Sequence, residues 1–222
     1  MKLLDVIKSS KAFRSKDLFF DGSCSIVGNS GKLLTTSFGN LIDQSDHVMR
    51  FNGAKTSPYT KSVGEKTSIR VLNCHYILNI DSENYYHHQK NRFPEMDRFF
   101  LYNLKGENIV FKTDPSWELW RKKEILNKVE KDNEVSFISQ QFYDLGKKIN
   151  NGSEPTNGFI GLMLGLKFFN EINCFGFSFY DDGSPKHYYE TVNCNPKNNH
   201  NFDKEKRIFN LLNEAKFIKL FN

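Results

Sequence analysis

The sequence lacks several features that would assign a location or a ligand at once. It has no run of about eighteen apolar residues, and charges at Lys2, Asp5 and Lys8 interrupt its start, which argues against a membrane span and a signal peptide. Its four cysteines form no C-x-x-C pair, which argues against a zinc site and favours a reduced intracellular chain. Since neither a repeat nor a biased linker divides the chain, we expect one domain, residues 1–222.

Two common nucleotide-binding patterns are also absent. The turn Gly28-Asn29-Ser30-Gly31 does not supply the G-x-G-x-x-G of dinucleotide-binding proteins. Ile26 stands where a phosphate loop ending in Gly31-Lys32 would need its first glycine. Both absences argue against an ordinary NAD or ATP site.

The composition indicates a globular chain that has an aromatic core and a polar surface. It has 21 Phe and 9 Tyr, yet its mean hydropathy is −0.57. The net charge of +5 suits an anionic small molecule or an anionic membrane surface, and it is too diffuse to indicate nucleic acid. Residues 1–20 fit a short amphipathic helix, which either packs onto the domain or docks weakly on a membrane surface.

Two predicted strands, residues 24–27 and 47–51, each end in a turn of small polar residues. The first ends at Gly28 and the second at Asn52-Gly53. Parallel strands would place both turns at the carboxyl edge of one sheet, where open α/β folds bind ligands. The side chains of Asn29, Ser30 and Asn52 then offer neutral hydrogen-bonding groups at this edge.

The elements around these strands complete an α/β pattern. A helix is expected to start at Ser30 or Thr35, and another is expected over residues 114–131. Further strands are predicted at residues 68–73, 99–103 and 108–112, and at the start of 135–149.

A second group of polar residues opens a helix that is apolar on almost every side. Thr156 or Asn157 fits its N-cap, and Gly158 follows. Such a helix must be buried, and its free N–H groups favour an anion or a polar base edge. The predicted strand 172–177 would return the chain to the sheet, across the site from Gly28.

Four stretches, in this order, resemble the motifs of the animal-type sialyltransferase family. Cys24–Gly31, Ile42-Asp43, Met49–Ala54 and Val63-Gly64 are similar to the large motif, and Pro155–Gly158, Asn170–Ile172 and Phe175–Phe177 to the small motif. His187-Tyr188-Tyr189-Glu190 is similar to the third motif. His200 and Glu205 keep the H-x-x-x-x-E of the very small motif.

This resemblance implies a GT-A-like, Rossmann-type α/β glycosyltransferase with a single, mostly parallel central sheet flanked by helices. It also implies an inverting sialyltransferase that needs no metal and no cofactor and uses CMP-sialic acid as donor and a glycan as acceptor. Residues of the large and small motifs would hold the donor: Gly28, Asn29, Ser30, Asn52, Thr156, Asn157 and Gly158. His187 would assist CMP departure and His200 would be the base, supported by Glu205, Tyr188 and Glu190.

The chemistry of histidine agrees with these two roles. Departure of CMP needs a hydrogen-bond donor, and attack by the acceptor needs a base with a pKa near neutrality. His200 precedes a predicted helix built on Ile208, Leu211, Leu212 and Ala215, whose positive end disfavours protonation. No D-x-D motif occurs, as expected of a transferase that does not clamp its nucleotide through a metal.

The sequence departs from the family pattern in ways that leave alternatives open. The small-motif cysteine falls at Phe169, so the family disulfide is absent and a Cys24–Cys174 bridge would be a different one. The membrane anchor is missing, so we expect a compact, cytoplasmic or membrane-peripheral enzyme from a bacterium or virus. Thr156-Asn157 replaces Ser-Thr, which leaves CMP-Kdo or another nonulosonate open as donor. A catalytically silent CMP- or glycan-binding module is the alternative from another class.

Overall fold

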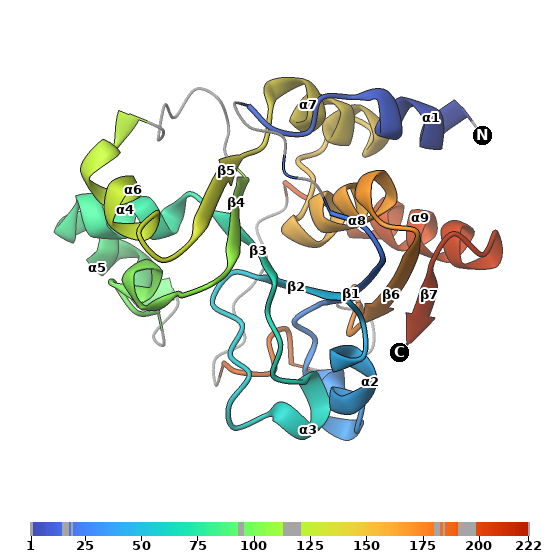
Figure 1. Ribbon diagram of the computed structural model, residues 1–222, viewed down its shortest axis with the longest axis horizontal. Coiled ribbons are helices and arrows are strands. Elements are labelled where there is room, and N and C mark those ends of the chain that lie inside the picture. Colours follow the sequence, from blue (N-terminus) through green and yellow to red (C-terminus); the bar gives the residue numbers. More distant parts are fainter. Residues whose placement is uncertain are drawn as a thin grey trace.

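A seven-stranded sheet in which every strand pair is parallel runs through the molecule (Figure 1). The computed structural model describes residues 2–14, 18, 20–92, 96–112, 121–179, 183, 185–190 and 199–221. The strand order is β5-β4-β3-β2-β1-β6-β7. The strands are β1 (Ser23–Val27), β2 (His47–Phe51), β3 (Ile69–Asn73), β4 (Asn108–Lys112), β5 (Glu134–Phe137), β6 (Glu171–Phe175) and β7 (Lys219–Phe221). The prediction of an α/β fold with one parallel sheet is confirmed.

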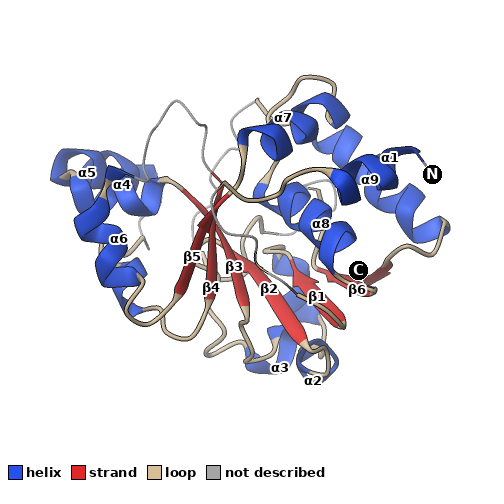
Figure 2. Cartoon of the chain, turned by 45° about the horizontal axis from the view of Figure 1, so that its top comes forward, coloured by secondary structure: helices blue, strands red, loops and turns tan. Residues whose placement is uncertain are grey.

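Helices connect the strands and cover both faces of the sheet (Figure 2). The α-helices are α1 (Lys2–Ser9), α2 (Gly39–Asp43), α3 (Thr60–Val63), α4 (His75–Asp81), α5 (Glu83–Arg92), α6 (Lys123–Val129), α7 (Gln140–Ile149), α8 (Asn157–Phe168) and α9 (Phe202–Glu214). Two 3-10 helices, η1 (Gly31–Thr35) and η2 (Phe100–Asn103), lie in the connections.

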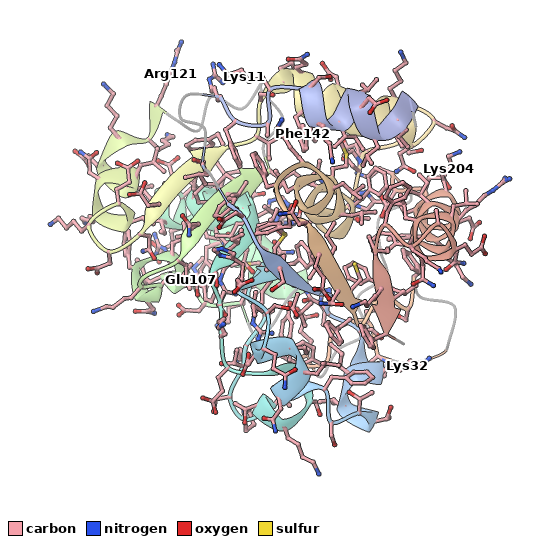
Figure 3. The ribbon with its side chains drawn as sticks, turned by 45° about the vertical axis from the view of Figure 1, so that its right-hand side comes forward. Lys11, Lys32, Glu107, Arg121, Phe142 and Lys204 are labelled. Carbon is pink, nitrogen blue, oxygen red and sulfur yellow. The ribbon has the colours of Figure 1, made fainter. Side chains whose placement is uncertain are left out.

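Helix α8 is packed against one face of the sheet at close range. The helix is apolar on all sides, as predicted, and its side chains join a core with α1, α7 and α9. Two glycines make the approach close: a Cβ on Gly161 would lie 2.6 Å from the ring of Phe51, and one on Gly165 would lie 2.8 Å from Ile26. Phe142 of α7 points into the same core in Figure 3, whereas Arg121 and Lys32 lie exposed at the periphery.

The opposite face of the sheet has two smaller apolar clusters. Val27, Val48 and Phe175 pack with residues of α2 and α3. On the other half of the sheet, residues of β3 and β4 pack with α4, α6 and η2. Strand residues alternate between the two faces, and apolar clusters pack on each of them. The sheet is therefore covered on both sides, as is usual for all-parallel sheets. Its polar groups are therefore available to a ligand mainly at the strand ends.

Several local predictions differ from the structure. The predicted strand 99–103 is wrong, since the 3-10 helix η2 occupies residues 100–103. Its apolar residues are accommodated without a strand: Leu101 is buried, and the Phe100 ring packs on Tyr76 at 5.1 Å. The helix expected from Ser30 or Thr35 is split into η1 and α2, with Ser30 as the N-cap of η1. The helix expected over 114–131 includes α6, but residues 113–120 lie outside the described residues. Strand β7 was not predicted.

Cys24, Cys74 and Cys174 are free and buried, so a Cys24–Cys174 bridge does not form. Cys194 lies outside the described residues. Within the described parts of the chain, no helix has both the length and the apolar character to span a bilayer.

Candidate active site

The candidate site lies where the strand order reverses direction. From β1 the chain adds β2 to β5 on one side, and then β6 and β7 on the other. In open α/β sheets, the crevice outside such a switch point is the usual ligand site. Here Gly28 N donates to Phe175 O at 2.7 Å, and a Cβ on Gly28 would lie only 2.4 Å from Gly176 O. Glycine at position 28 thus lets the turns after β1 and β6 meet.

A cavity of about 680 Å³ runs along this edge of the sheet. The ends of β1, β2, β3, β4 and β6 contribute to its lining, as do the start of α8, the start of α9 and the segment 186–190. Every residue that the sequence singled out lines it except Tyr188. The lining members are Gly28, Asn29, Ser30, Asn52, Thr156, Asn157, Gly158, His187, Glu190, His200 and Glu205.

Three asparagines place amide groups around the middle of the cavity. The Oδ1 atom of Asn52 accepts hydrogen bonds from the Asn73 N–H at 3.1 Å and from Asn157 Nδ2 at 3.0 Å. Asn29 Nδ2 donates to the Tyr189 hydroxyl at 3.1 Å. The Oδ1 atoms of Asn29 and Asn157 are buried without a partner among the described residues. Because a buried acceptor without a partner is costly, these two oxygens suit a ligand that has hydroxyl or amino donors.

Asn52 has a second property that the position requires. Its backbone φ is +52°, in the left-handed region that asparagine tolerates better than most residues. This conformation turns the chain directly after β2 and brings the Asn52 side chain to the start of α8. Sequence reasoning chose Asn52 for its amide group; its backbone is a further reason for asparagine at this position.

His187 and Glu190 form a close pair in the lining of the cavity. His187 Nδ1 lies 2.6 Å from Glu190 Oε2, and both side chains are largely buried. The carboxylate accepts the Nδ1 proton, which fixes the ring and leaves the Nε2 edge available. The imidazole also stacks on the Tyr189 ring at 5.4 Å.

Tyr188 and Tyr189 are buried in the same apolar cluster, but of the two only Tyr189 lines the cavity. Tyr188 does not line the cavity: its hydroxyl donates to Lys55 O, and its ring packs on Tyr59 at 5.3 Å. It belongs to the core beneath the site. Tyr189, which sequence analysis gave no role, lines the cavity and accepts from Asn29.

His200, which lies just before α9, is held by the backbone carbonyl of Glu154. Its Nδ1 lies 2.7 Å from Glu154 O; since a carbonyl can only accept, Nδ1 carries the proton and Nε2 keeps its lone pair. Burial lowers the pKa of His200, and the positive charge of Lys112 lowers it further, against the opposing effect of Glu154. A neutral imidazole with a free Nε2 is the state that a general base needs.

Glu205 connects α9 to the start of α8. It is 1% exposed and accepts hydrogen bonds from the Thr156 N–H at 2.9 Å, the Thr156 hydroxyl at 2.6 Å and Asn150 Nδ2 at 3.2 Å. Thr156 is in turn the N-cap of α8, because its hydroxyl accepts from the Phe159 N–H at 3.0 Å. Glu205 is therefore a structural support of the site.

Glu205 should make the stability of the protein depend on pH. Burial raises the pKa of this carboxyl from 4.5 to about 7, so its contribution to stability is full below about pH 4.5 and is lost as the pH rises through about 7. We expect the wild type to lose up to about 3 kcal/mol of unfolding free energy relative to Glu205→Gln across this window. Urea unfolding at a series of pH values measures the difference.

The exposed Glu130→Gln is the matched control for this titration. Its unfolding free energy should follow that of the wild type at every pH. Parallel curves for wild type and Glu205→Gln would contradict the assignment.

Among the lining residues that sequence analysis missed, three interact with the predicted site residues. Glu154 precedes the small motif, Tyr189 lies inside the third motif, and Lys112 ends β4. The only available signal for Lys112 was a lysine at the end of a predicted strand. Among the described residues, no group of three or more His, Cys, Asp or Glu side chains is arranged to hold a metal ion.

Comparison with known proteins finds relatives of this chain among sialyltransferases. A rat CMP-N-acetylneuraminate-beta-1,4-galactoside alpha-2,3-sialyltransferase is 27% identical over 242 residues, which cover 97% of this chain and 62% of the relative. A rat beta-galactoside alpha-2,6-sialyltransferase 2 is 29% identical over 69% of this chain and 30% of its own length. The chain thus spans less than two thirds of the length of these curated relatives.

Solved structures share the fold. A mammalian sialyltransferase superposes with a TM-score of 0.65 at 19% identity, over 99% of this chain and 76% of that one. The alpha-2,3-sialyltransferase Cst-I of Campylobacter jejuni gives a TM-score of 0.57 at 17% identity, over 93% of this chain and 78% of that one.

The decisive comparison is with whole families. The sequence profile of glycosyltransferase family 29 (sialyltransferase) matches residues 11–217, which contain all four motifs and the cavity. The resemblance proposed from the motifs is confirmed. The chain belongs to glycosyltransferase family 29, the sialyltransferase family.

Proposed function

We propose that this protein is an inverting sialyltransferase that moves sialic acid from CMP-sialic acid to a hydroxyl of a glycan. The observation that carries the proposal is the pair of differently held histidines in one cavity. His200 is held through Nδ1 by a carbonyl and His187 through Nδ1 by a carboxylate. Relatives whose names specify CMP-N-acetylneuraminate as the donor support this choice of substrate.

In the proposed reaction, His200 Nε2 takes the proton of the acceptor hydroxyl while that oxygen forms a bond to the anomeric carbon of the donor. The bond from the anomeric carbon to the phosphate oxygen breaks, and CMP leaves with the electron pair. His187, with Nδ1 held by Glu190, carries a second proton on Nε2 in this role and donates it in a hydrogen bond to the departing phosphate, where negative charge develops. Attack from the face opposite to the leaving group inverts the anomeric configuration.

The donor is proposed to lie at the switch point, between the turns after β1 and β2 and the start of α8. Asn29 and Asn157 each present an unpartnered amide oxygen there, which suits the ribose hydroxyls or the cytosine amino group. The free N–H groups at the start of α8 favour an anion. Gly158 keeps the helix start close to Phe177, because a Cβ there would lie 2.9 Å from that ring.

The acceptor is proposed to enter at the β3 and β4 end of the cavity. His75 and Tyr76 line this end, together with Asp97 and Phe100. Tyr76 and Phe100 are in ring contact, and aromatic faces beside polar groups are suited to sugar rings. Since the named acceptors of the curated relatives are galactosides, we propose a galactose-terminated glycan as the first acceptor class.

The test measures CMP release and glycan product from CMP-N-acetylneuraminate, with and without galactose-terminated acceptors. We expect release that depends on acceptor and that persists in EDTA, which also tests the expected metal independence. Release from CMP-Kdo alone would point to a different CMP-linked keto sugar. CMP binding without any turnover would identify a binding module and contradict the proposal.

The expected location of the protein stays a prediction. The sequence suggests a cytoplasmic enzyme with weak peripheral contact to membranes, and fractionation of producing cells at low and high salt measures both. Release of the protein from membranes by salt would support an electrostatic contact.

A further inference from the structure

Lys112 is the last residue of β4, a central strand of the sheet. The three residues before it, Ile109 to Phe111, are completely buried. Lys112 is partly buried and lines the cavity, so the strand delivers a cation to the carboxyl edge of the sheet. No motif of the sequence analysis includes it.

The ammonium group of Lys112 holds the middle of a short segment, residues 154–156. Its Nζ donates a hydrogen bond to Pro155 O. The residue before Pro155 binds the base, because Glu154 O accepts from His200. The residue after it binds the buried carboxylate, because Thr156 donates to Glu205 through both its N–H and its hydroxyl. One cation thus fixes the residue between the anchors of His200 and Glu205.

The charged groups that act on Lys112, Glu154 and Glu205, also line the cavity. Burial lowers the pKa of Lys112 to about 8, against the opposing effects of Glu154, Glu205 and Cys74, which favour its charged form. The described residues provide no carboxylate within salt-bridge distance of Nζ. Among the described residues its positive charge therefore has no direct ion pair, and it acts on Glu154, Glu205 and His200 through space.

We propose that Lys112 is a positioning residue for the base: its ammonium fixes segment 154–156, which anchors His200 and Glu205, and its positive charge favours the neutral form of His200. This inference rests on the proposed role of His200 as general base. A lysine that merely fills space at the end of β4 would share the hydrogen bond to Pro155, but it would have no effect on the protonation of His200.

The sign of the effect follows from the charges. The groups that face His200 are Lys112 from β4 and Glu154 from segment 154–156; those that face Glu205 are Lys112 and Thr156. Lys112 lowers the pKa of both His200 and Glu205. Removing it raises both, so each group binds a proton at a higher pH than in the wild type.

The experiment compares kcat against pH for wild type, Lys112→Met and Lys112→Arg. In Lys112→Met, the acid limb should move up by about one pH unit, which corresponds to about a tenfold loss of rate on that limb. The curves should approach each other above about pH 8, where Lys112 of the wild type loses its charge. Lys112→Arg should keep the acid limb close to that of the wild type.

A second measurement is independent of turnover. NMR titration of the histidine side chains, with the His200 signal assigned by its loss in His200→Ala, should show a higher midpoint for His200 in Lys112→Met. The exposed control Lys131→Met should show the His200 midpoint of the wild type.

The outcomes separate this inference from the proposed function. An equal loss of kcat at every pH in Lys112→Met, with an unchanged His200 midpoint, would overturn the electrostatic role. A Lys112→Arg enzyme whose acid limb moves as far as that of Lys112→Met would also overturn it, as would wild-type behaviour of both variants. If His200→Ala transfers sialic acid at the wild-type rate, the base assignment fails, whereas the NMR midpoint still tests the effect of Lys112 on His200.

Discussion

His200→Ala should lower kcat for transfer by about 10²–10⁴-fold, the usual range for loss of a general base, with CMP affinity unchanged. The reason is geometric: Nδ1 of His200 is occupied by Glu154 O, so Nε2 is the ring atom left to take the acceptor proton. The alanine variant keeps the N-cap of α9, since that cap is Asn201. Steady-state transfer assays, with calorimetry for CMP, measure the two quantities.

The control for this variant is His87→Ala, which removes an exposed histidine of α5 that lies outside the cavity. Its rate should equal that of the wild type. A His200→Ala enzyme that retains its rate would remove the base assignment, and one that loses CMP binding as well would indicate a damaged site.

His187→Ala should lower kcat by about 10²–10³-fold, the loss expected for one donor to a developing anion. In contrast to His200, this residue is proposed to act on the departure of CMP, a step shared by transfer and by slow hydrolysis of the donor. Both rates should therefore fall by the same factor in His187→Ala, whereas His200→Ala should impair transfer more than hydrolysis. Product analysis by chromatography separates the two reactions.

Glu190→Gln is the matched companion of His187→Ala. It keeps the size of the side chain but weakens the 2.6 Å contact that fixes the His187 ring. We expect a smaller loss in both reactions than in His187→Ala. If His187→Ala and Glu190→Gln lowered transfer but left donor hydrolysis at the wild-type rate, His187 would not assist the departure of CMP.

The residues at the strand and helix ends that line the cavity could be predicted because local signals mark them. Gly28 and Asn52 directly follow apolar strands, and Thr156 directly precedes an apolar helix. In such places, the sequence alone determines that a polar group sits at a strand or helix end. Parallel pairing then brings the ends together, and the four motifs in order select one family.

The rest of the site depends on contacts between distant segments. Lys112 meets Pro155 across 43 residues, and nothing near either residue indicates this contact. Tyr188 and Tyr189 are adjacent and identical in type, so only the tertiary structure decides which of them faces the cavity. The strand predicted at residues 99–103 was wrong because a short apolar run fits a strand and a 3-10 helix equally well.

The two buried thiols in the centre of the sheet offer a use beyond packing. Cys24 of β1 and Cys174 of β6 lie on neighbouring strands directly beneath the switch point, and burial raises the pKa of both. A thiol reagent can reach them only when these strands separate, because in the closed sheet the reagent has no access and burial keeps both thiols protonated. The rate at which Cys24 and Cys174 themselves are labelled in the native protein therefore reports how often the centre of the sheet opens beneath the cavity.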